Sequence, residues 1–145
     1  MTKVEALLQE LRNKGKRSTV LSRAVLKILA LTKVPISSEE VRRQLLRKKY
    51  RVNKTTVYRQ LHSLHQLNLI DEIQFNDRSK RFELASTESD HHHHLICLEC
   101  EKVEDINFAA DVERQARRIT KTKHFKVLRH SLEFFGVCAE CQKKR

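Results

Sequence analysis

Apolar residues recur at helical spacing over the first third of the chain. The segments 4–12 and 21–32 both carry apolar side chains three and four positions apart, which predicts two amphipathic helices. Pro35 ends any continuation of the second helix. Ser37, followed three residues later by Glu40, forms a capping box, so a third helix is expected to start after Ser37.

A fourth helix is predicted over about 54–67, with Asn53 as its N-cap. One face of this helix is apolar, and the other face carries Thr55, Tyr58, Arg59 and His62. Alternating apolar and polar residues then follow at 69–75 and 80–85, and the polar residues 76–79 between them have the length of a hairpin turn. Short helices followed by a hairpin predict a winged helix-turn-helix.

The rest of the chain mixes strands with one helix. Strands are expected over 92–100, 101–106 and 125–138, and an amphipathic helix over 109–121. We therefore expect an α+β protein with a winged-helix DNA-binding domain at 1–84 and a small α/β metal-binding dimerisation domain at 85–145. A unit of about 60 residues buries little apolar surface, so a bound metal and a second copy are both expected to stabilise it.

Charge separates the two parts of the chain. The net charge is +12, and residues 1–54 hold 15 Lys and Arg against 4 Asp and Glu, whereas residues 85–145 hold 11 against 10. A basic segment of this kind either binds nucleic acid or is a solvated surface. No run of about 18 apolar residues and no secretory signal is present, so we expect a cytoplasmic protein.

The four cysteines form two Cys-x-x-Cys pairs. Thiols stay reduced in the cytoplasm, so the pairs predict metal ligands rather than disulfides, and four thiolates form the closed tetrahedral shell that structural Zn²⁺ prefers. The predicted structural zinc ligands are Cys97, Cys100, Cys138 and Cys141.

Four consecutive histidines precede the first cysteine pair. On a strand, His91 and His93 point one way while His92 and His94 point the other, so the run begins two different sites rather than one. Either pair alone is also compatible with a solvated strand edge. Further candidate ligands are Glu83, Asp105, Glu113 and His130. Mixed imidazole and carboxylate shells suit Zn²⁺, Fe²⁺ or Mn²⁺.

Two other functions fit parts of this pattern. A zinc-dependent hydrolase would use the histidine cluster with a carboxylate as general base, but the chain has no HExxH motif and no glycine-rich pocket loop. A zinc-ribbon adaptor would need only the cysteines, and the paired histidines and carboxylates argue against it. No enzymatic activity is expected.

With these motifs, the chain resembles the Fur (ferric uptake regulator) family of metal-responsive bacterial repressors. The resemblance covers nearly the whole chain and rests on Thr19-x-x-x-Arg23, Thr56-Val57-Tyr58-Arg59, Arg81-Phe82-Glu83-Leu84, the segment from His91 to Cys100, and the segment from His130 through Cys141. It implies a metal-loaded dimer that binds palindromic operators and controls metal uptake or peroxide-stress genes. The expected partners are double-stranded operator DNA and a second copy of the chain, with neither a membrane nor a small-molecule substrate.

The resemblance also implies a role for individual residues. The regulatory metal, Fe²⁺, Zn²⁺ or Mn²⁺, would be held by Glu83, His92, His94 and Asp105. A second metal would be held by His91 or His93 with Glu113 and His130. The residues predicted to contact DNA are Lys14, Lys16, Arg17, Thr19, Arg23, Thr55, Thr56, Tyr58 and Arg59.

Two positions depart from the pattern of the family. The family commonly supplies a histidine to the regulatory site just ahead of the third helix, where this chain has Pro35. Either a water replaces that ligand or domain closure is driven differently. Glu101 stands where the family usually has glycine after the first cysteine pair.

Overall fold

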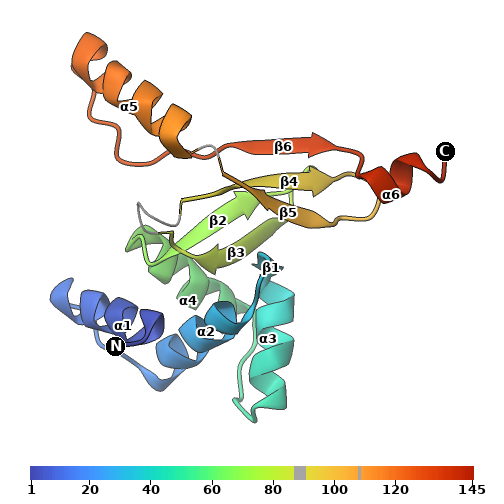
Figure 1. Cartoon of the computed structure of the whole chain (residues 1–145). Coiled ribbons are helices and arrows are strands. Elements are labelled where there is room, and N and C mark those ends of the chain that lie inside the picture. The colour runs from blue at the N-terminus through green and yellow to red at the C-terminus, as the bar shows by residue number, and fades with distance from the viewer. Residues whose placement is uncertain (87–90, 108) are drawn as a thin grey trace. The chain divides into compact units, whose positions relative to one another are not determined.

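The computed structural model describes residues 1–86, 91–107 and 109–145 (Figure 1). The chain forms two compact units, Met1–Ala85 and Ser86–Arg145, each with its own sheet. None of the helices in the described part of the chain is long and apolar enough to cross a bilayer.

The first unit contains the four predicted helices. They are α1 (Lys3–Asn13), α2 (Val20–Leu31), α3 (Ser38–Arg47) and α4 (Lys54–Gln66). Thr2, Thr19 and Ser37 each complete a capping box at the start of their helix, and the side chain of Asn53 accepts a hydrogen bond from the N–H of Thr56 at 2.8 Å. These caps satisfy backbone donors that would otherwise lack partners, so the helix starts are encoded locally.

A small antiparallel sheet follows the helices. Its strands are β1 (Ile36–Ser37), β2 (Ile70–Gln74) and β3 (Lys80–Leu84), in the order β1-β3-β2. In the predicted hairpin turn, the Asp77 carboxylate accepts from the Ser79 N–H at 2.9 Å and Arg78 has φ 63°. Strand β1 was not predicted, because two residues are too few to show a period.

The core of the first unit lies between the helices and the sheet. Every helix contributes to it, and the fully buried side chains include Leu26 of α2, Leu45 of α3 and Leu61 of α4. Phe82 of β3 is 2% exposed and packs in the same core, which ties the hairpin to the helices. Because α4 turns its apolar side inward, its polar side faces solvent.

The second unit is built around a mixed sheet of three strands. Its elements are β4 (His93–Cys97), β5 (Val103–Ile106), α5 (Ala109–Lys123), β6 (Glu133–Gly136) and α6 (Ala139–Gln142). The strand order is β5-β4-β6, with β4 antiparallel to β5 and parallel to β6. The sheet therefore brings the residues after β6 beside the Cys-x-x-Cys turn after β4.

All three strands predicted for the second unit were too long, and the one expected over 101–106 begins only at Val103. The strand expected over 92–100 is limited to His93–Cys97, and of the segment 125–138 only Glu133–Gly136 is a strand, followed by the unpredicted helix α6. Strand β6 pairs with β4 from Glu133 opposite His94 onward. Since β4 begins at His93, the residues well before Glu133 lie beyond the end of β4 and cannot pair with it.

Candidate metal centres and nucleic-acid interface

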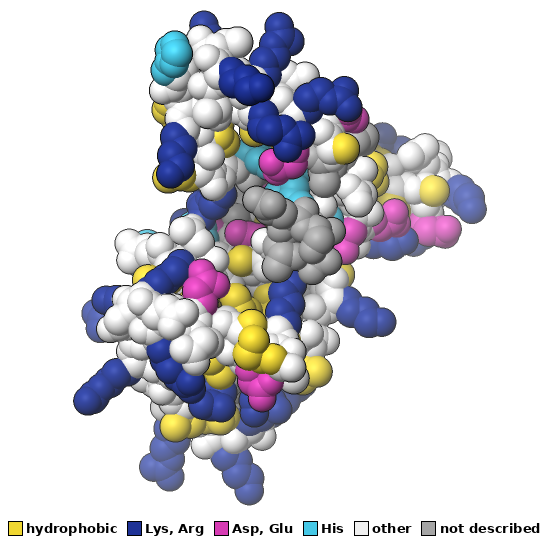
Figure 2. Space-filling view, turned by 60° about the vertical axis from the view of Figure 1, so that its left-hand side comes forward, with side chains coloured by type: hydrophobic (Ala, Val, Ile, Leu, Met, Phe, Trp, Pro, Cys, Tyr) yellow, Lys and Arg dark blue, Asp and Glu magenta, His cyan; other side chains and the backbone are white. Residues whose placement is uncertain are grey.

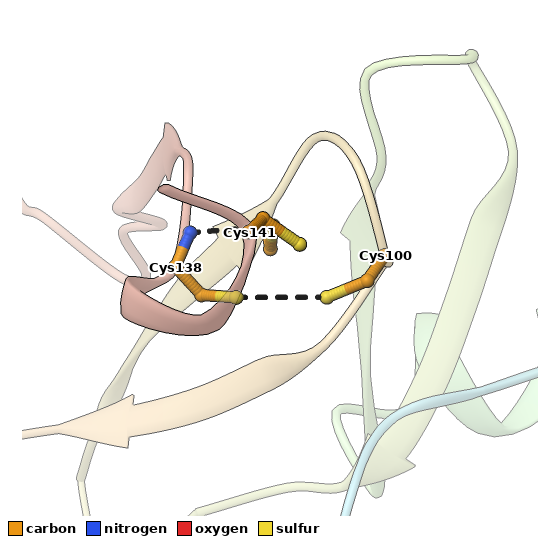
Figure 3. Close-up of side chains that lie close together, drawn as sticks. Cys100, Cys138 and Cys141 are labelled. Atoms are coloured by element: carbon orange, nitrogen blue, oxygen red, sulfur yellow. Dashed lines mark hydrogen bonds between the residues drawn. The ribbon is translucent and has the colours of Figure 1, made fainter. Parts of the chain in front are cut away.

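The sulfur atoms of the two cysteine pairs converge at one end of the second sheet. One atom from each of the four lies within 4.8 Å of all the others, and the four residues are Cys97, Cys100, Cys138 and Cys141. Figure 3 shows three of them directed toward one another, with 3.7 Å between the sulfurs of Cys100 and Cys138. Cys97 ends β4 and Cys138 caps α6, so the parallel pairing of β4 with β6 brings the pairs together.

The pKa values of the thiols in this cluster are shifted in opposite directions. The backbone N–H of Cys138 donates to the sulfur of Cys97 at 3.3 Å, and this bond is the main cause that lowers the pKa of Cys97 to about 6. The neighbouring thiol of Cys138 and burial raise the pKa of Cys141 to about 12. A cation that binds four thiolates removes these protons, so metal binding should release protons. The all-sulfur donor set and the small separation fit Zn²⁺ in a structural site.

Three histidines form a second cluster in the same unit. His91, His93 and His130 each place a ring nitrogen within 4.8 Å of the others, and the Nε2 atoms of His91 and His130 are 2.7 Å apart. His93 is 2% exposed, and its Nε2 is buried without a hydrogen-bond partner among the described residues. Burial, followed by the nearby His91 and His130, lowers the pKa of His93. A buried neutral imidazole with a free nitrogen fits a metal ligand.

Glu113 is not part of this histidine cluster. It lies in the first half of α5 and is half-buried, but its carboxylate is outside the group of atoms that meet at His91, His93 and His130. The histidine cluster therefore offers three nitrogen donors, and the fourth ligand predicted for it stays a prediction.

The other two histidines of the run lie near Asp105. The Nε2 atoms of His92 and His94 are each 3.9 Å from Asp105 Oδ1, and Asp105 is the register partner of His94 across β4 and β5. His94 is buried, while the Asp105 side chain is 54% exposed. Two imidazoles and a carboxylate thus lie close together within the second unit. Glu83, the predicted fourth ligand, lies on β3 of the first unit, directly opposite Asp71 of β2.

The exposed face of α4 carries the residues predicted to read DNA. Thr55, Thr56, Tyr58 and Arg59 are all exposed, and Tyr58 is 46% exposed. Thr55 and Tyr58 also line a groove of about 470 Å³ between α3 and α4. Helix α4 of the first unit thus presents a continuous polar surface of the kind that a recognition helix needs.

Some of the residues around the first two helices that are predicted to contact DNA are simply exposed, while others also form contacts within the first unit. Lys16, Arg17 and Arg23 are exposed. Lys14 donates to the carbonyl of Leu67 at 2.5 Å and pairs with Glu10 at 3.0 Å, so its ammonium group already joins α1 to the end of α4. The hydroxyl of Thr19 accepts from the Ser22 N–H at 3.0 Å as the cap of α2. Thr19 therefore also has a structural role.

A sequence model of the Ferric uptake regulator family matches residues 13–135, which is most of the chain. The chain belongs to the ferric uptake regulator family. It is 32% identical over 139 residues to the peroxide operon regulator of Bacillus subtilis, covering 94% of this chain and 92% of that protein. It is 31% identical over 137 residues to the ferric uptake regulation protein of Bordetella parapertussis, covering 94% and 96%.

Solved structures of the family share the fold. The ferric uptake regulator of Helicobacter pylori, described as having three functional metal binding sites, is 25% identical, with a TM-score of 0.76 over 96% of this chain and 93% of that one. The Pseudomonas aeruginosa regulator with manganese is 25% identical, with a TM-score of 0.73 over 90% and 96%. These matches confirm the predicted fold class, a winged helix followed by an α/β dimerisation domain.

The position where this family usually has glycine has a structural explanation. Glu101 follows Cys100 with φ 59°, in the left-handed region that glycine adopts without strain. Its N–H donates to the carbonyl of Cys97 at 3.0 Å, which closes the turn that carries the first cysteine pair. The turn therefore has the conformation that glycine would favour, although the residue is glutamate.

Two contacts, one on α4 and one at the first cysteine turn, were not predicted. His62 stacks on Tyr58, with ring centroids 6.3 Å apart and 7° between the planes, so the i, i+4 spacing on α4 was the signal that could have identified it. Arg145 donates to Glu99 through both Nε and Nη2, which joins the end of the chain to the first cysteine turn. No local pattern indicates a contact between residues 46 positions apart.

Proposed function

We propose that this member of the family is a metal-dependent transcriptional repressor that acts as a homodimer in the cytoplasm. The observation that supports it best is the division of one histidine run between two groups of metal ligands, in the unit that follows a winged helix. His91 and His93 meet His130, whereas His92 and His94 lie near Asp105. A protein with only a structural zinc would need neither group.

The cysteine cluster is proposed to hold the structural Zn²⁺. Its four thiolates close the coordination shell, so no position is left open for substrate, which is the mark of a structural rather than a catalytic site. The zinc would fix the Cys97 turn against α6 and so hold β6 beside β4.

The regulatory metal is proposed to bind His92, His94 and Asp105, with Glu83 as the ligand from the first unit. Pro35 cannot ligate a metal, so Glu83 is the remaining ligand that the family resemblance places in the winged-helix unit. Metal affinity would then bias the position of the winged helices through β3, the strand that also carries Phe82 of the core. A ligand shifts such an equilibrium only by its difference in affinity for the two states.

DNA recognition is proposed to divide between two sets of residues. Arg59 and Tyr58 of α4 would contact base edges in the major groove, while Lys16 and Arg17 would contact the backbone or the minor groove. Two winged helices related by the dimer axis would read half-sites about 34 Å apart or a multiple of that distance. The relatives named above make metal uptake genes or peroxide-stress genes the proposed targets.

The decisive experiment is a metal titration of the zinc-only dimer, read out as affinity for operator DNA with Fe²⁺, Mn²⁺ and Zn²⁺ in turn. A repressor gains operator affinity with at least one metal. If none of the metals changes the affinity and zinc remains bound, the chain is a zinc adaptor. Hydrolysis that depends on an added metal would instead support the hydrolase.

A pair of double variants tests which histidines are regulatory. His92→Ala with His94→Ala should abolish the response of DNA binding to metal while one zinc per chain remains. His91→Ala with His93→Ala should lower the metal content or dimer stability and leave the response largely intact. Loss of the response only in the second variant would assign regulation to the His130 cluster instead.

A further inference from the structure

Helix α5 carries a stripe of positive charge that none of the proposed sites uses. Arg114, Arg117, Arg118 and Lys121 follow one another at i, i+3, i+4 and i+7, so they lie along one side of the helix, and all four are exposed. Val112 and Ala116, which are half-buried, lie on the opposite side. The four charges of the stripe therefore point away from the side that carries Val112 and Ala116.

From Arg114 onward, the charge of this segment is of one sign. Residues 114–129 contain seven Lys and Arg and no Asp or Glu. In Figure 2, Lys and Arg side chains gather at the top of the view, at the height where α5 lies in Figure 1. The remainder of the second unit is acidic by contrast, since residues 85–145 carry 10 Asp and Glu in total. The positive charge of the second unit is therefore concentrated in one segment, although the unit as a whole is nearly neutral.

The stripe has few acidic partners among the described residues. Elsewhere, Lys14, the C-cap residue of α1, pairs with Glu10 at 3.0 Å, and Arg42 of α3 pairs with Glu39 at 3.0 Å. In the described part of α5, the stripe's only ion pair joins Arg114 to Asp111 at 3.9 Å, between side chains that are 73% and 75% exposed. Arg114 with Arg118, and Arg117 with Lys121, are instead like-charged i, i+4 pairs, which destabilise a helix.

A polyanion removes this repulsion. The stripe places four charges along about 10 Å of helix, at the rise of about 1.5 Å per residue. Duplex DNA carries one negative charge per about 1.7 Å of its axis, and arginine binds phosphate through two parallel N–H bonds. Three of the four stripe residues are arginine. The winged helix would already hold DNA near this unit, which raises the effective concentration of phosphate.

We propose that the basic stripe of α5 is a second DNA-binding surface, which contacts backbone phosphates outside the operator without reading sequence. This inference rests on the proposed function, because operator binding by the winged helix is what brings the duplex. The phosphates belong either to the DNA flanking the operator or to a second duplex. In either case, the surface adds affinity and salt dependence but no discrimination between sequences.

The test compares two triple variants of the full-length, metal-loaded dimer. The stripe variant carries Arg114→Gln, Arg117→Gln and Arg118→Gln, and glutamine keeps both side-chain length and helix propensity. The control variant carries Lys102→Gln, Lys143→Gln and Lys144→Gln, which removes the same charge from the same unit. Zinc content and dimer mass are measured for both, so that loss of fold is recognised.

Affinity is measured against salt with two duplexes, one limited to the operator and one extended by several helical turns on both sides. Each phosphate contact changes affinity roughly 3.5-fold over a fourfold change in salt, so three contacts on one protomer amount to roughly 40-fold. The unmodified protein should show a steeper salt dependence on the long duplex than on the short one. The stripe variant should lose that difference while keeping its preference for operator over random sequence, and the control variant should keep both.

A second arm identifies the source of the phosphates. If the stripe binds a second duplex, beads carrying operator DNA and the protein capture a labelled random duplex, and the stripe variant does not. If it binds flanking DNA, capture is absent and only the long duplex shows the effect.

Other outcomes overturn the proposal. If the unmodified protein and the stripe variant have identical salt slopes and no duplex is captured, the stripe is a solvated face of the helix. If the stripe and control variants lose the same DNA affinity, the effect comes from net charge and not from the stripe. Dissociation of the stripe variant into monomers would make it a contact between copies. Binding to phosphatidylglycerol vesicles with unchanged DNA slopes would assign it to a membrane surface. If the unmodified protein fails to distinguish operator from random DNA, the proposed function fails instead.

Discussion

The stability of the second unit should depend on its cysteines far more than on its apolar core. Among the described residues of this unit, the buried apolar side chains are Ile96, Cys97 and Cys141. Burying one isoleucine contributes about 1.5–3 kcal/mol, whereas structural Zn²⁺ contributes about 10–16 kcal/mol to the folding of zinc-finger peptides at pH 7. The difference is comparable with the whole stability of an ordinary domain, about 5–15 kcal/mol. Loss of zinc should therefore unfold this unit.

The substitution Cys138→Ser isolates the ligand. Cys138 provides a sulfur to the cluster, and it is also the N-cap residue of α6. Serine is a favourable N-cap, so the variant should keep the start of α6 and lose only the thiolate. Ile96→Val is the matched control in the apolar part of the unit, and it should cost only about 0.5–1.5 kcal/mol.

Calorimetry with zinc analysis provides the measurement. The unmodified protein should contain one tightly bound zinc per chain and show separate contributions from its two units. In Cys138→Ser, the zinc and the transition of the second unit should disappear, together with dimerisation, while the first unit melts as before. A strong chelator should reproduce this result with the unmodified protein, and Ile96→Val should retain its zinc. Retention of zinc, the second transition and a normal dimer in Cys138→Ser would refute the argument.

Three further predictions concern DNA, metal response and backbone strain. Arg59→Ala should reduce discrimination between operator and random DNA by about 1–3 kcal/mol if Arg59 reads a guanine. Lys16→Ala should instead weaken binding to both sequences and lower the salt slope by about 1. If a binding assay shows equal losses for Arg59→Ala on both sequences, Arg59 is only a phosphate contact. His94→Ala should raise the metal concentration needed for DNA binding without loss of the structural zinc of the cysteine cluster. An unchanged midpoint of the metal titration would exclude His94 as a ligand. Glu101→Gly should relieve the φ of 59° but make the unfolded chain more flexible, so the net change in unfolding free energy should stay within about 1 kcal/mol; a large loss would show that the glutamate side chain stabilises the turn.

Local patterns in the sequence determined much of this protein. The four helices of the first unit, with caps at Thr2, Thr19, Ser37 and Asn53, depend on residues three or four positions apart, and such interactions are fixed by helical geometry. The hairpin and the two Cys-x-x-Cys turns are equally local. The helices of the first unit, the exposed polar face of α4 and the two Cys-x-x-Cys turns could therefore be predicted from the amino-acid sequence alone.

Tertiary structure decided which distant groups meet. His91 approaches His130 across 39 residues and Arg145 approaches Glu99 across 46, and both contacts depend on strand order and on where pairing stops. The same pairing shortened the strands expected around the histidine run and before the second cysteine pair. Glu113 was predicted as a ligand, but helical periodicity gave no information about its distance from the histidines. Periodicity assigns a side chain to a face, but the register of β4 with its neighbours determines which faces share a site.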